Sequence, residues 1–145
     1  MDMDTSNRSR MAGVTLLELM AVVMVIGILG MIAMPSYRQY VMRAQRTEAK
    51  TALLRLQTNQ ERFYLANRTY GGNASLAALG FPTGMTENGT YALTIAGADA
   101  NTYTVTATPV AGARIDMTQD AMCTTLTITA QGVKTATGTN PTSCW

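Results

Sequence analysis

A long uncharged segment near the amino terminus constrains this chain more than any other feature. Seventeen of the 21 residues from Val14 to Met34 are apolar, and no charged residue lies between Leu19 and Tyr37. The chain is 47% hydrophobic overall because this segment is averaged with a remainder of ordinary polarity. At 1.5 Å per residue, such a helix is about 31 Å long, close to the ~30 Å hydrocarbon thickness of a bilayer. We therefore predict a membrane-spanning helix rather than a helix buried in a small domain.

One acid and three helix-weakening residues interrupt this apolar segment. Glu18 lies inside it, and a carboxylate within a bilayer costs about 3 kcal/mol on insertion scales, so it requires a partner. Gly27 and Gly30 each cost ~1 kcal/mol relative to alanine, and Pro35 removes a backbone donor. The sequence therefore marks Glu18 as a functional residue. It also marks Gly27–Pro35 as a region that is kinked in lipid or that unwinds in an assembly.

The residues that flank the apolar segment bear on processing and orientation. A secretory signal peptide has its apolar region before the cleavage site, whereas here the apolar run begins after Gly13. Cleavage at that glycine would leave the hydrophobic segment on the mature protein. More basic residues follow the segment than precede it, and this count alone would put the carboxy-terminal domain in the cytoplasm. They are Arg8 and Arg10 before it, and Arg38, Arg43, Arg46 and Lys50 after it.

Beyond Pro35 the sequence predicts that the helix continues to about Asn67 as an amphipathic helix. A stripe of residues recurs every three or four positions, which is the spacing of one helix face suited to packing on a sheet. The stripe contains Ala49, Ala52, Leu53, Leu56, Gln60, Phe63 and Tyr64. The remaining surfaces are expected to carry most of the basic residues, which are Arg46, Lys50, Arg55 and Arg62.

The second half of the chain has the character of a β-sheet. Residues 69–145 contain 18 threonines, a residue that favours strands. Alternation of apolar and small polar residues, typical of antiparallel strands with one buried face, occurs in 91–95, 103–108 and 125–130. Gln131-Gly132 predicts a hairpin into a fourth strand at Val133–Thr135. We expect an α+β fold with the long helix packed on a four-stranded antiparallel sheet, and an ordered surface loop over 109–122.

The two cysteines, Cys123 and Cys144, favour a disulfide over two free buried thiols. Such a disulfide would enclose about 20 residues, contribute ~3 kcal/mol and require an oxidising compartment. That compartment places the second half outside the cytoplasm, against the count of basic residues. A zinc site is disfavoured because histidine is absent and carboxylates would have to complete the ligand set.

Catalysis is the class of function that the composition excludes most directly. Without histidine, neither a Ser/His/Asp nor a Cys/His arrangement is possible. The acids of the second half are scattered and are interpreted as solvated loop residues: Glu87, Asp99, Asp116 and Asp120. The last two lack the further oxygen ligands of a recognisable calcium motif. We expect no enzymatic activity, no cofactor and no metal site.

The stretch Gly13–Met20 (GVTLLELM), followed by the apolar run with Pro35, resembles the amino terminus of type IV pilins. That family has a basic leader ending in glycine, a Thr-Leu-(Leu/Ile)-Glu sequence and a long apolar helix. The resemblance implies cleavage after Gly13 by prepilin peptidase and N-methylation of Val14. It also implies that Glu18 pairs with the amino terminus of a neighbouring subunit during assembly. Val14 departs from the phenylalanine or methionine usual at this position.

The carboxy terminus resembles that of PilE-type minor pilins. The matching features are a cysteine before the Leu126–Ile128 strand, a turn at Gly132–Lys134 and a closing Cys144-Trp145. The resemblance implies a chain of four parts. They are a leader peptide (1–13), a transmembrane and filament-core helix (14–35), an amphipathic extension (36–67) and a disulfide-closed β head (68–145).

The function that this resemblance implies is that of a minor pilin. The subunit is expected in the bacterial inner membrane with a periplasmic head, and then in an extracellular pilus that supports pilus biogenesis, twitching motility and adhesion. Its expected partners are other pilin subunits, prepilin peptidase and the inner-membrane assembly machinery.

Two alternatives stay open: a second structural protein, which is a pseudopilin of type II secretion, and a binding module, which is a DNA-uptake pilin of the ComP type. DNA binding needs a basic surface, usually with aromatic residues for stacking. Beyond residue 69 the sequence offers Arg114 and Lys134 as cations, and Trp145 is interpreted as a packing residue beside the disulfide.

Overall fold

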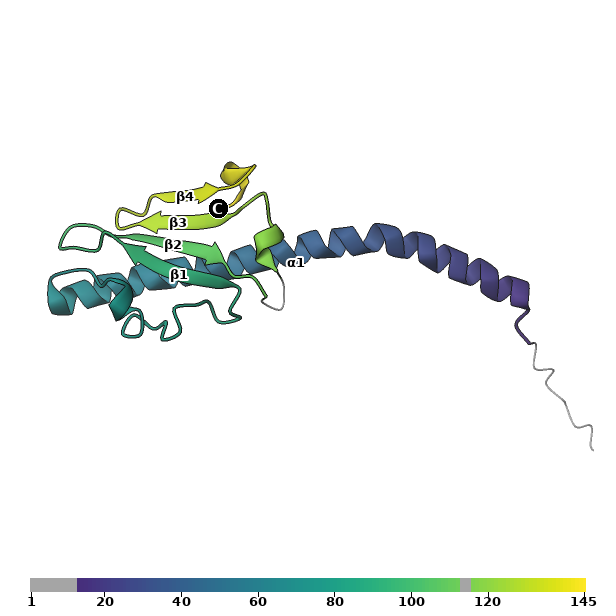
Figure 1. Cartoon of the computed structure of the whole chain (residues 1–145), viewed down its shortest axis with the longest axis horizontal. Coiled ribbons are helices and arrows are strands. Elements are labelled where there is room, and N and C mark those ends of the chain that lie inside the picture. Colours follow the sequence, from purple (N-terminus) through teal and green to yellow (C-terminus); the bar gives the residue numbers. More distant parts are fainter. Residues whose placement is uncertain (1–12, 113–115) are drawn as a thin grey trace, which may run out of the picture. The chain divides into compact units, whose positions relative to one another are not determined.

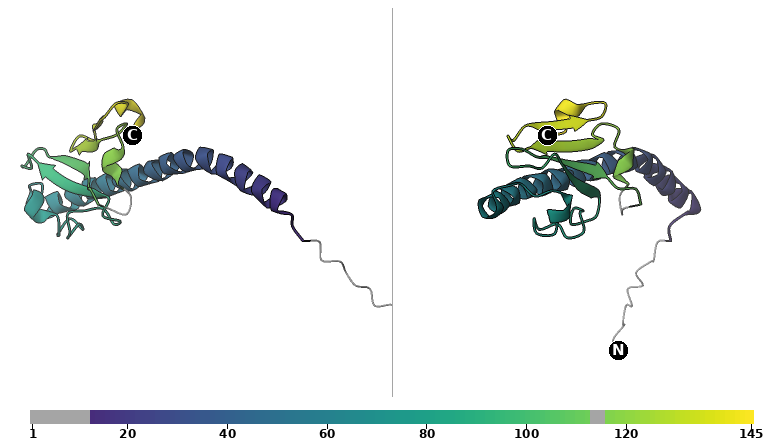
Figure 2. Two further views of the ribbon diagram at one scale, coloured as in Figure 1. Left: turned by 45° about the vertical axis from the view of Figure 1, so that its right-hand side comes forward. Right: turned by 60° about the vertical axis from the view of Figure 1, so that its left-hand side comes forward.

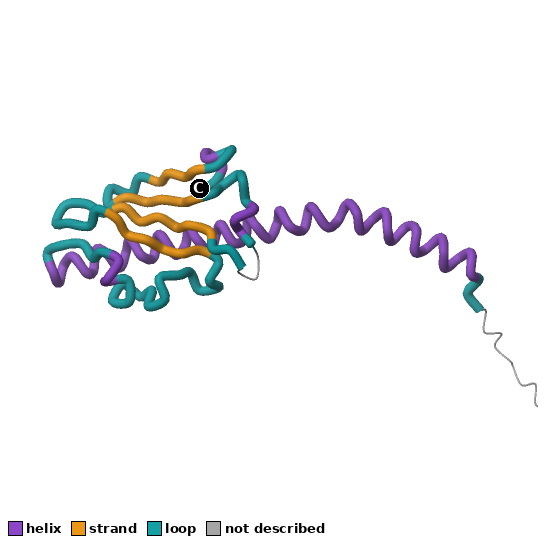
Figure 3. The backbone as a smooth tube through the Cα atoms, in the orientation of Figure 1, coloured by secondary structure: helices purple, strands orange, loops and turns teal. Residues whose placement is uncertain are grey.

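The computed structural model describes residues 13–112 and 116–145, in two compact units, one ending at Arg38 and the other spanning Gln39–Trp145 (Figure 1). Helix α1 (Leu16–Asn67) has 52 residues and contributes to both units (Figure 3). Thr15 caps its first turn, since its Oγ1 accepts the N–H of Glu18 at 3.2 Å. The helix stops at Asn67 because the next residue, Arg68, has a left-handed φ of 57°.

The second unit contains a four-stranded antiparallel sheet in the order β1-β2-β3-β4, which confirms the predicted fold. Its strands are β1 (Tyr91–Ala96), β2 (Thr104–Pro109), β3 (Thr125–Thr129) and β4 (Lys134–Thr137). The fourth strand starts one residue later than the sequence predicts. Val133 still belongs to the turn, in which Gly132 has φ 76° and the Val133 carbonyl accepts the N–H of Thr129 at 3.1 Å.

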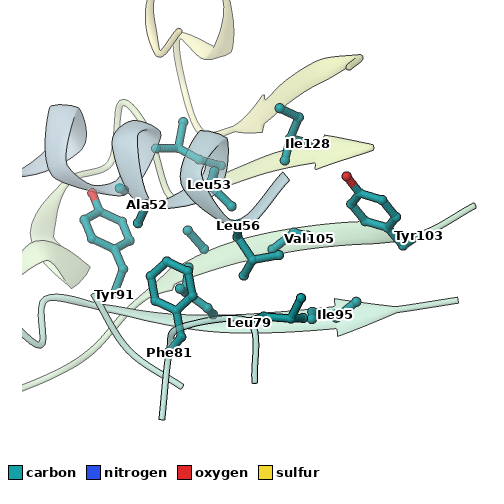
Figure 4. Packing of buried hydrophobic residues seen from close by; sticks show 14 of the residues in the cluster. Ala52, Leu53, Leu56, Leu79, Phe81, Tyr91, Ile95, Tyr103, Val105 and Ile128 are labelled. Atoms are coloured by element: carbon teal, nitrogen blue, oxygen red, sulfur yellow. The ribbon is translucent and has the colours of Figure 1, made fainter. Parts of the chain in front are cut away.

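The hydrophobic core lies between this sheet and the part of α1 that follows Gln39 (Figures 2 and 4). Most residues of the predicted helix stripe are buried, although Phe63 and Tyr64 are half-buried, and the inward strand residues are those of the predicted alternation. Members of the core include Ala49, Leu53, Leu56, Leu93, Val105, Leu126 and Ile128. The other face of the sheet carries threonines, with Thr94, Thr106, Thr127 and Thr135 aligned across all four strands.

One polar residue of the helix stripe is buried for a specific reason. Gln60 is fully buried, and its amide makes two reciprocal hydrogen bonds with the backbone of Gly71. Nε2 donates to the carbonyl at 2.7 Å, and Oε1 accepts the N–H at 2.8 Å. Because a buried amide without partners is costly, this pairing explains why glutamine occupies a core position. It fixes the start of the loop that leads from α1 to the sheet.

Three short 3-10 helices lie in the connections: η1 (Asn73–Ser75), η2 (Met117–Gln119) and η3 (Pro141–Ser143). The segment 109–122 is predicted as a surface loop, but part of it is packed into the interior of the second unit. Met117 and Asp120 are buried, while residues 113–115, including Arg114, lie outside the described part of the chain.

Candidate functional site

The apolar segment of α1 is exposed along its length. A stretch of this helix is long and apolar enough to cross a membrane, and none of that stretch is buried within the protein. Its large side chains, among them Leu19, Val23 and Ile26, have more than half of their surface accessible. Hydrophobic surface of this extent is stable in water only when something else covers it, which in this segment means lipid or other helices.

Glu18 lies in the first turn of α1, at the third position after the Thr15 cap. The Thr15 cap is the half of a Thr-x-x-Glu capping box that forms in this chain, and it explains why the helix begins here. The Glu18 carboxylate is exposed and makes no hydrogen bond or ion pair within the described residues. The structure therefore leaves this acid available at the positive end of a helix dipole, where a negative charge is favoured.

The predicted processing site precedes α1. Gly13 and Val14 are the first two described residues, and Val14 is 71% exposed. Residues 1–12 of the predicted leader lie outside the described part of the chain.

The predicted unwinding region lies within continuous α1. A Cβ atom added at Gly27 or Gly30 would meet no atom within 4 Å. Packing inside this chain therefore does not require glycine at either position. Pro35 also lies within α1.

Cys123 and Cys144 form the expected disulfide, with a Cα–Cα distance of 5.7 Å. Both half-cystines are buried in the core. The bond ties the start of β3 to the segment that follows β4, and it fits the oxidising compartment inferred from the sequence.

The structure corrects the interpretation of two charged residues. Arg46 was expected on a solvent-facing surface and Asp120 was expected to be a solvated loop acid, but they are only 8% and 2% exposed. Nε and Nη2 of Arg46 donate to the two carboxylate oxygens of Asp120, each at 2.5 Å. This hydrogen-bonded acid is the main reason that the pKa of Arg46 is raised above its ordinary value. The ion pair holds the segment before β3 against α1.

The spacing of residues in the sequence is sufficient to predict that one member of this pair, Arg46, is buried. Arg46 lies three residues before Ala49 and seven before Leu53, so it belongs to the buried stripe by spacing. Its partner could not have been found in this way, because Asp120 lies 74 residues away in an irregular segment.

The arrangement of an exposed apolar helix, a lone acid in its first turn and a disulfide-closed α+β head can be compared with known proteins. A family model described as type IV minor pilin ComP, DNA uptake sequence receptor, matches residues 35–127, more than half of the chain. The chain belongs to this type IV minor pilin family.

Two further comparisons accompany this match. Among solved structures, this minor pilin is similar to the non-core minor pilin PilV of Neisseria meningitidis, with a TM-score of 0.52. The identity is 23%, over 70% of this chain and 91% of the PilV chain, and the likeness shows a shared fold. Comparison with curated protein sequences gives no match.

Given the description of the family, the distribution of cations on this minor pilin becomes relevant. We define the helix–β4 corner as Lys50 and Gln57 of α1, Lys134 of β4 and Trp145. Nε2 of Gln57 lies 3.7 Å from the position of a Cβ added at Gly132, which brings this part of α1 next to the β3–β4 turn. Burial lowers the pKa of Lys50, and the positive charges of Arg46 and Lys134 lower it further.

Trp145 is fixed in the helix–β4 corner by two contacts. Its indole N–H donates to the carbonyl of Thr135 at 2.7 Å. The ammonium group of Lys134 lies 5.4 Å from the centre of its ring, a cation–π distance. Trp145 is therefore a packing residue at the edge of the core, as the sequence suggested, and part of its aromatic surface is already covered.

Proposed function

We propose that this chain is a minor pilin subunit that inserts in the bacterial inner membrane, is processed after Gly13 and assembles into a type IV pilus. The observation that carries the proposal is Glu18, an exposed acid without a partner in the described chain, in the first turn of an apolar and unburied helix. Membership of a minor pilin family supports it. The oxidised cysteines agree with a periplasmic head before assembly and an extracellular head afterwards.

In the proposed assembly, prepilin peptidase creates a new amine on Val14, which is then N-methylated. A carboxylate inside the hydrophobic layer costs about 3 kcal/mol, and an ion pair with a neighbouring subunit's amine offsets this cost. Because this pair forms only at one axial offset between subunits, Glu18 would fix the register of the filament. The Gly27–Pro35 region can lengthen by losing helical bonds, since no packing within this chain holds its two glycines. Other pilins and the inner-membrane assembly machinery are the required partners, and pilus biogenesis, twitching motility and adhesion are the processes served.

The proposal is tested by replacing Glu18 with alanine in cells that carry the chain as their only copy. We expect the variant to remain in the membrane fraction but to be lost from sheared pili. Glu87→Ala, an exposed acid of the head, is the matched control and should assemble as the unmodified chain does. Normal incorporation of the Glu18→Ala chain would contradict the proposed role of the acid. Mass spectrometry of the pilus subunit should find a methylated Val14 as its first residue.

A second candidate function is binding of DNA, and it is favoured by the description of the matching family as a DNA uptake sequence receptor. The sequence beyond residue 69 has few cations, and the basic residues of α1, among them Lys50, Arg55 and Arg62, add to them. Binding of a fluorescent DNA duplex to the purified chain, measured at several salt concentrations, tests this candidate. Electrostatic binding to DNA must weaken steeply as salt rises. Absence of binding at low salt would exclude it.

A further inference from the structure

Three tyrosine rings are in contact near the carboxy-terminal end of α1. The ring centroids of Tyr64 and Tyr70 lie 4.8 Å apart with an interplanar angle of 33°. Those of Tyr70 and Tyr103 lie 4.7 Å apart with an angle of 62°. Tyr64 belongs to the last turn of α1, Tyr70 follows the helix, and Tyr103 directly precedes β2. Both separations are those of interacting aromatic pairs, so Tyr70 contacts a second tyrosine on each of two sides.

The position of Tyr70 is fixed by backbone hydrogen bonds. Its N–H donates to the carbonyl of Asp99 at 2.9 Å, and the adjacent Gly71 is held by its two hydrogen bonds with Gln60. The contact between Tyr64 and Tyr70 is therefore built into the fold. Two phenol rings joined through ortho carbons have centroids about 4 Å apart, which is two ring radii and one carbon–carbon bond. Tyr64 and Tyr70 are thus held close to the separation that such a bond requires.

The two ring contacts are equally close, so the fate of the phenol proton distinguishes them. One-electron oxidation of a buried phenol needs an acceptor for its proton, because the cation that otherwise remains is a charge in a low-dielectric interior. The hydroxyl of Tyr70 donates to Oε1 of Glu61 at 3.3 Å, so this carboxylate can take the proton. Tyr64 is half-buried and can release its proton to water. The hydroxyl of Tyr103 is buried and has no hydrogen-bond partner in the part of the chain that the structure describes, which disfavours its oxidation.

We infer that Tyr64 and Tyr70 form a site of oxidative cross-linking, at which hydrogen peroxide acting through a haem peroxidase couples the two rings. Each ring loses one electron and one proton, and the two radicals join through a carbon atom ortho to each hydroxyl. The hydrogen at each joined carbon is then lost as a proton while a proton returns to each oxygen, which restores both phenols. In total the chain loses two hydrogen atoms, and one molecule of hydrogen peroxide is reduced to two molecules of water.

This cross-link would fasten the end of the helix. It joins the last turn of α1 to a residue just beyond Arg68, whose left-handed φ of 57° ends the helix. Like the Cys123–Cys144 disulfide, it is a covalent closure that forms only under oxidising conditions. Because the link constrains the unfolded chain, the cross-linked protein should unfold at a higher urea concentration than the unlinked one.

The test treats the full-length chain in non-ionic detergent with hydrogen peroxide and a haem peroxidase. Groups held together have effective concentrations of millimolar or more, so at about 10 μM chain this pair should couple on the order of 100 times faster than rings on separate chains. Trypsin cleaves after Arg62 and Arg68, which puts Tyr64 and Tyr70 in different peptides. Mass spectrometry should find these two peptides joined and lighter by two hydrogen atoms. Dityrosine fluorescence, excited beyond the absorption of tryptophan, gives the yield.

Phenylalanine variants separate this pair from the other tyrosines while they retain the rings that pack in the fold. Tyr64→Phe and Tyr70→Phe should each reduce the dityrosine yield to the low level that arises between chains. Tyr103→Phe is one matched control, because this ring contacts Tyr70 but is buried. Tyr40→Phe is the other, because Tyr40 is 71% exposed and makes no ring contact with another described residue. Both controls should retain the full yield of the cross-link.

Several results would overturn the inference. A full yield of dityrosine in Tyr64→Phe or Tyr70→Phe would show that other residues are joined. Loss of the yield in Tyr103→Phe would assign the link to the buried contact instead. An oxidised chain that contains no dityrosine, or only links between chains, would show that this pair does not react. The proposal of a pilus subunit is independent of all of these results.

Discussion

Replacing Asp120 with asparagine should destabilise the head more than any other conservative change to a charged residue in it. The substitution preserves the shape of the side chain but leaves Arg46 without a counter-charge. Arg46 and Asp120 are both buried, and two hydrogen bonds of 2.5 Å join them. Removing one partner of a buried pair costs about 3–5 kcal/mol, because the other charge remains desolvated. In a unit of about 100 residues, this corresponds to a fall in melting temperature of roughly 12–20 °C.

The assay is urea unfolding of the purified chain, followed by the fluorescence of Trp145, which is the only tryptophan. Asp116→Asn is the matched control, since this acid lies in the same segment and its side chain accepts the N–H of Thr118 at 3.0 Å. Asparagine can accept the same hydrogen bond, so the control should change the free energy of unfolding by less than ~0.5 kcal/mol.

A double variant separates the destabilising effect of an unpaired charge from the contribution of the ion pair to the free energy of unfolding. Arg46→Met combined with Asp120→Leu removes both charges and retains apolar volume, so it should recover most of the lost stability. A loss of less than ~1 kcal/mol in Asp120→Asn would refute the reasoning. The reasoning would also be refuted if the double variant lost as much free energy of unfolding as the two single variants lose together, because the residues would then act independently.

Three further predictions concern the head. Cys123→Ala/Cys144→Ala should lower the free energy of unfolding by ~3 kcal/mol and make urea unfolding insensitive to reductant, since the disulfide closes a long loop. Burial alone would raise the pKa of Glu48, but hydrogen bonds from Asn88 outweigh it and hold this pKa below its ordinary value of 4.5. Glu48 therefore contributes stability above that value that is lost as pH falls through the folded-state pKa, and Glu48→Gln should flatten the urea midpoint between about pH 5 and pH 3. The buried hydroxyl of Tyr103 has no hydrogen-bond partner among residues 13–112 and 116–145, so Tyr103→Phe should leave the free energy of unfolding unchanged or raise it by up to ~1 kcal/mol.

Each of these three has an outcome that would contradict it. For the cysteines it is a variant as stable as the oxidised chain. For Glu48 it is an acid response that the Gln variant does not alter. For Tyr103 it is a loss of more than ~1 kcal/mol, which would mean that the hydroxyl has a partner in solution.

The fold was predictable because its signals are local and periodic. The helix stripe at Ala49, Leu53 and Leu56 has the period of one helix face, and the strand segments have a period of two. β1 and β3 begin at their predicted positions, β2 and β4 begin one residue later, and each strand pairs with its neighbour in the chain. β4 begins late because a turn hydrogen bond to the Val133 carbonyl, rather than residue type, decides where its pairing starts.

The residues of the candidate functional site differ in how far the sequence alone identifies them. Glu18 could be singled out from the sequence because its significance lies in contrast with the apolar residues around it, and no fold is needed to see that contrast. The approach of Gln57 to the β3–β4 turn at Gly132 could not be singled out, because these residues are far apart in the sequence and only the tertiary fold brings them together.

By itself, the sequence determined the membrane-length helix, its single acid, the antiparallel sheet and the pair of cysteines, since each depends on periodicity, composition or the identity of neighbouring residues. Only the tertiary structure decided which charges are neutralised. It buried Arg46 against Asp120, because the energy of a charge depends on its partners in space and on the water excluded around them.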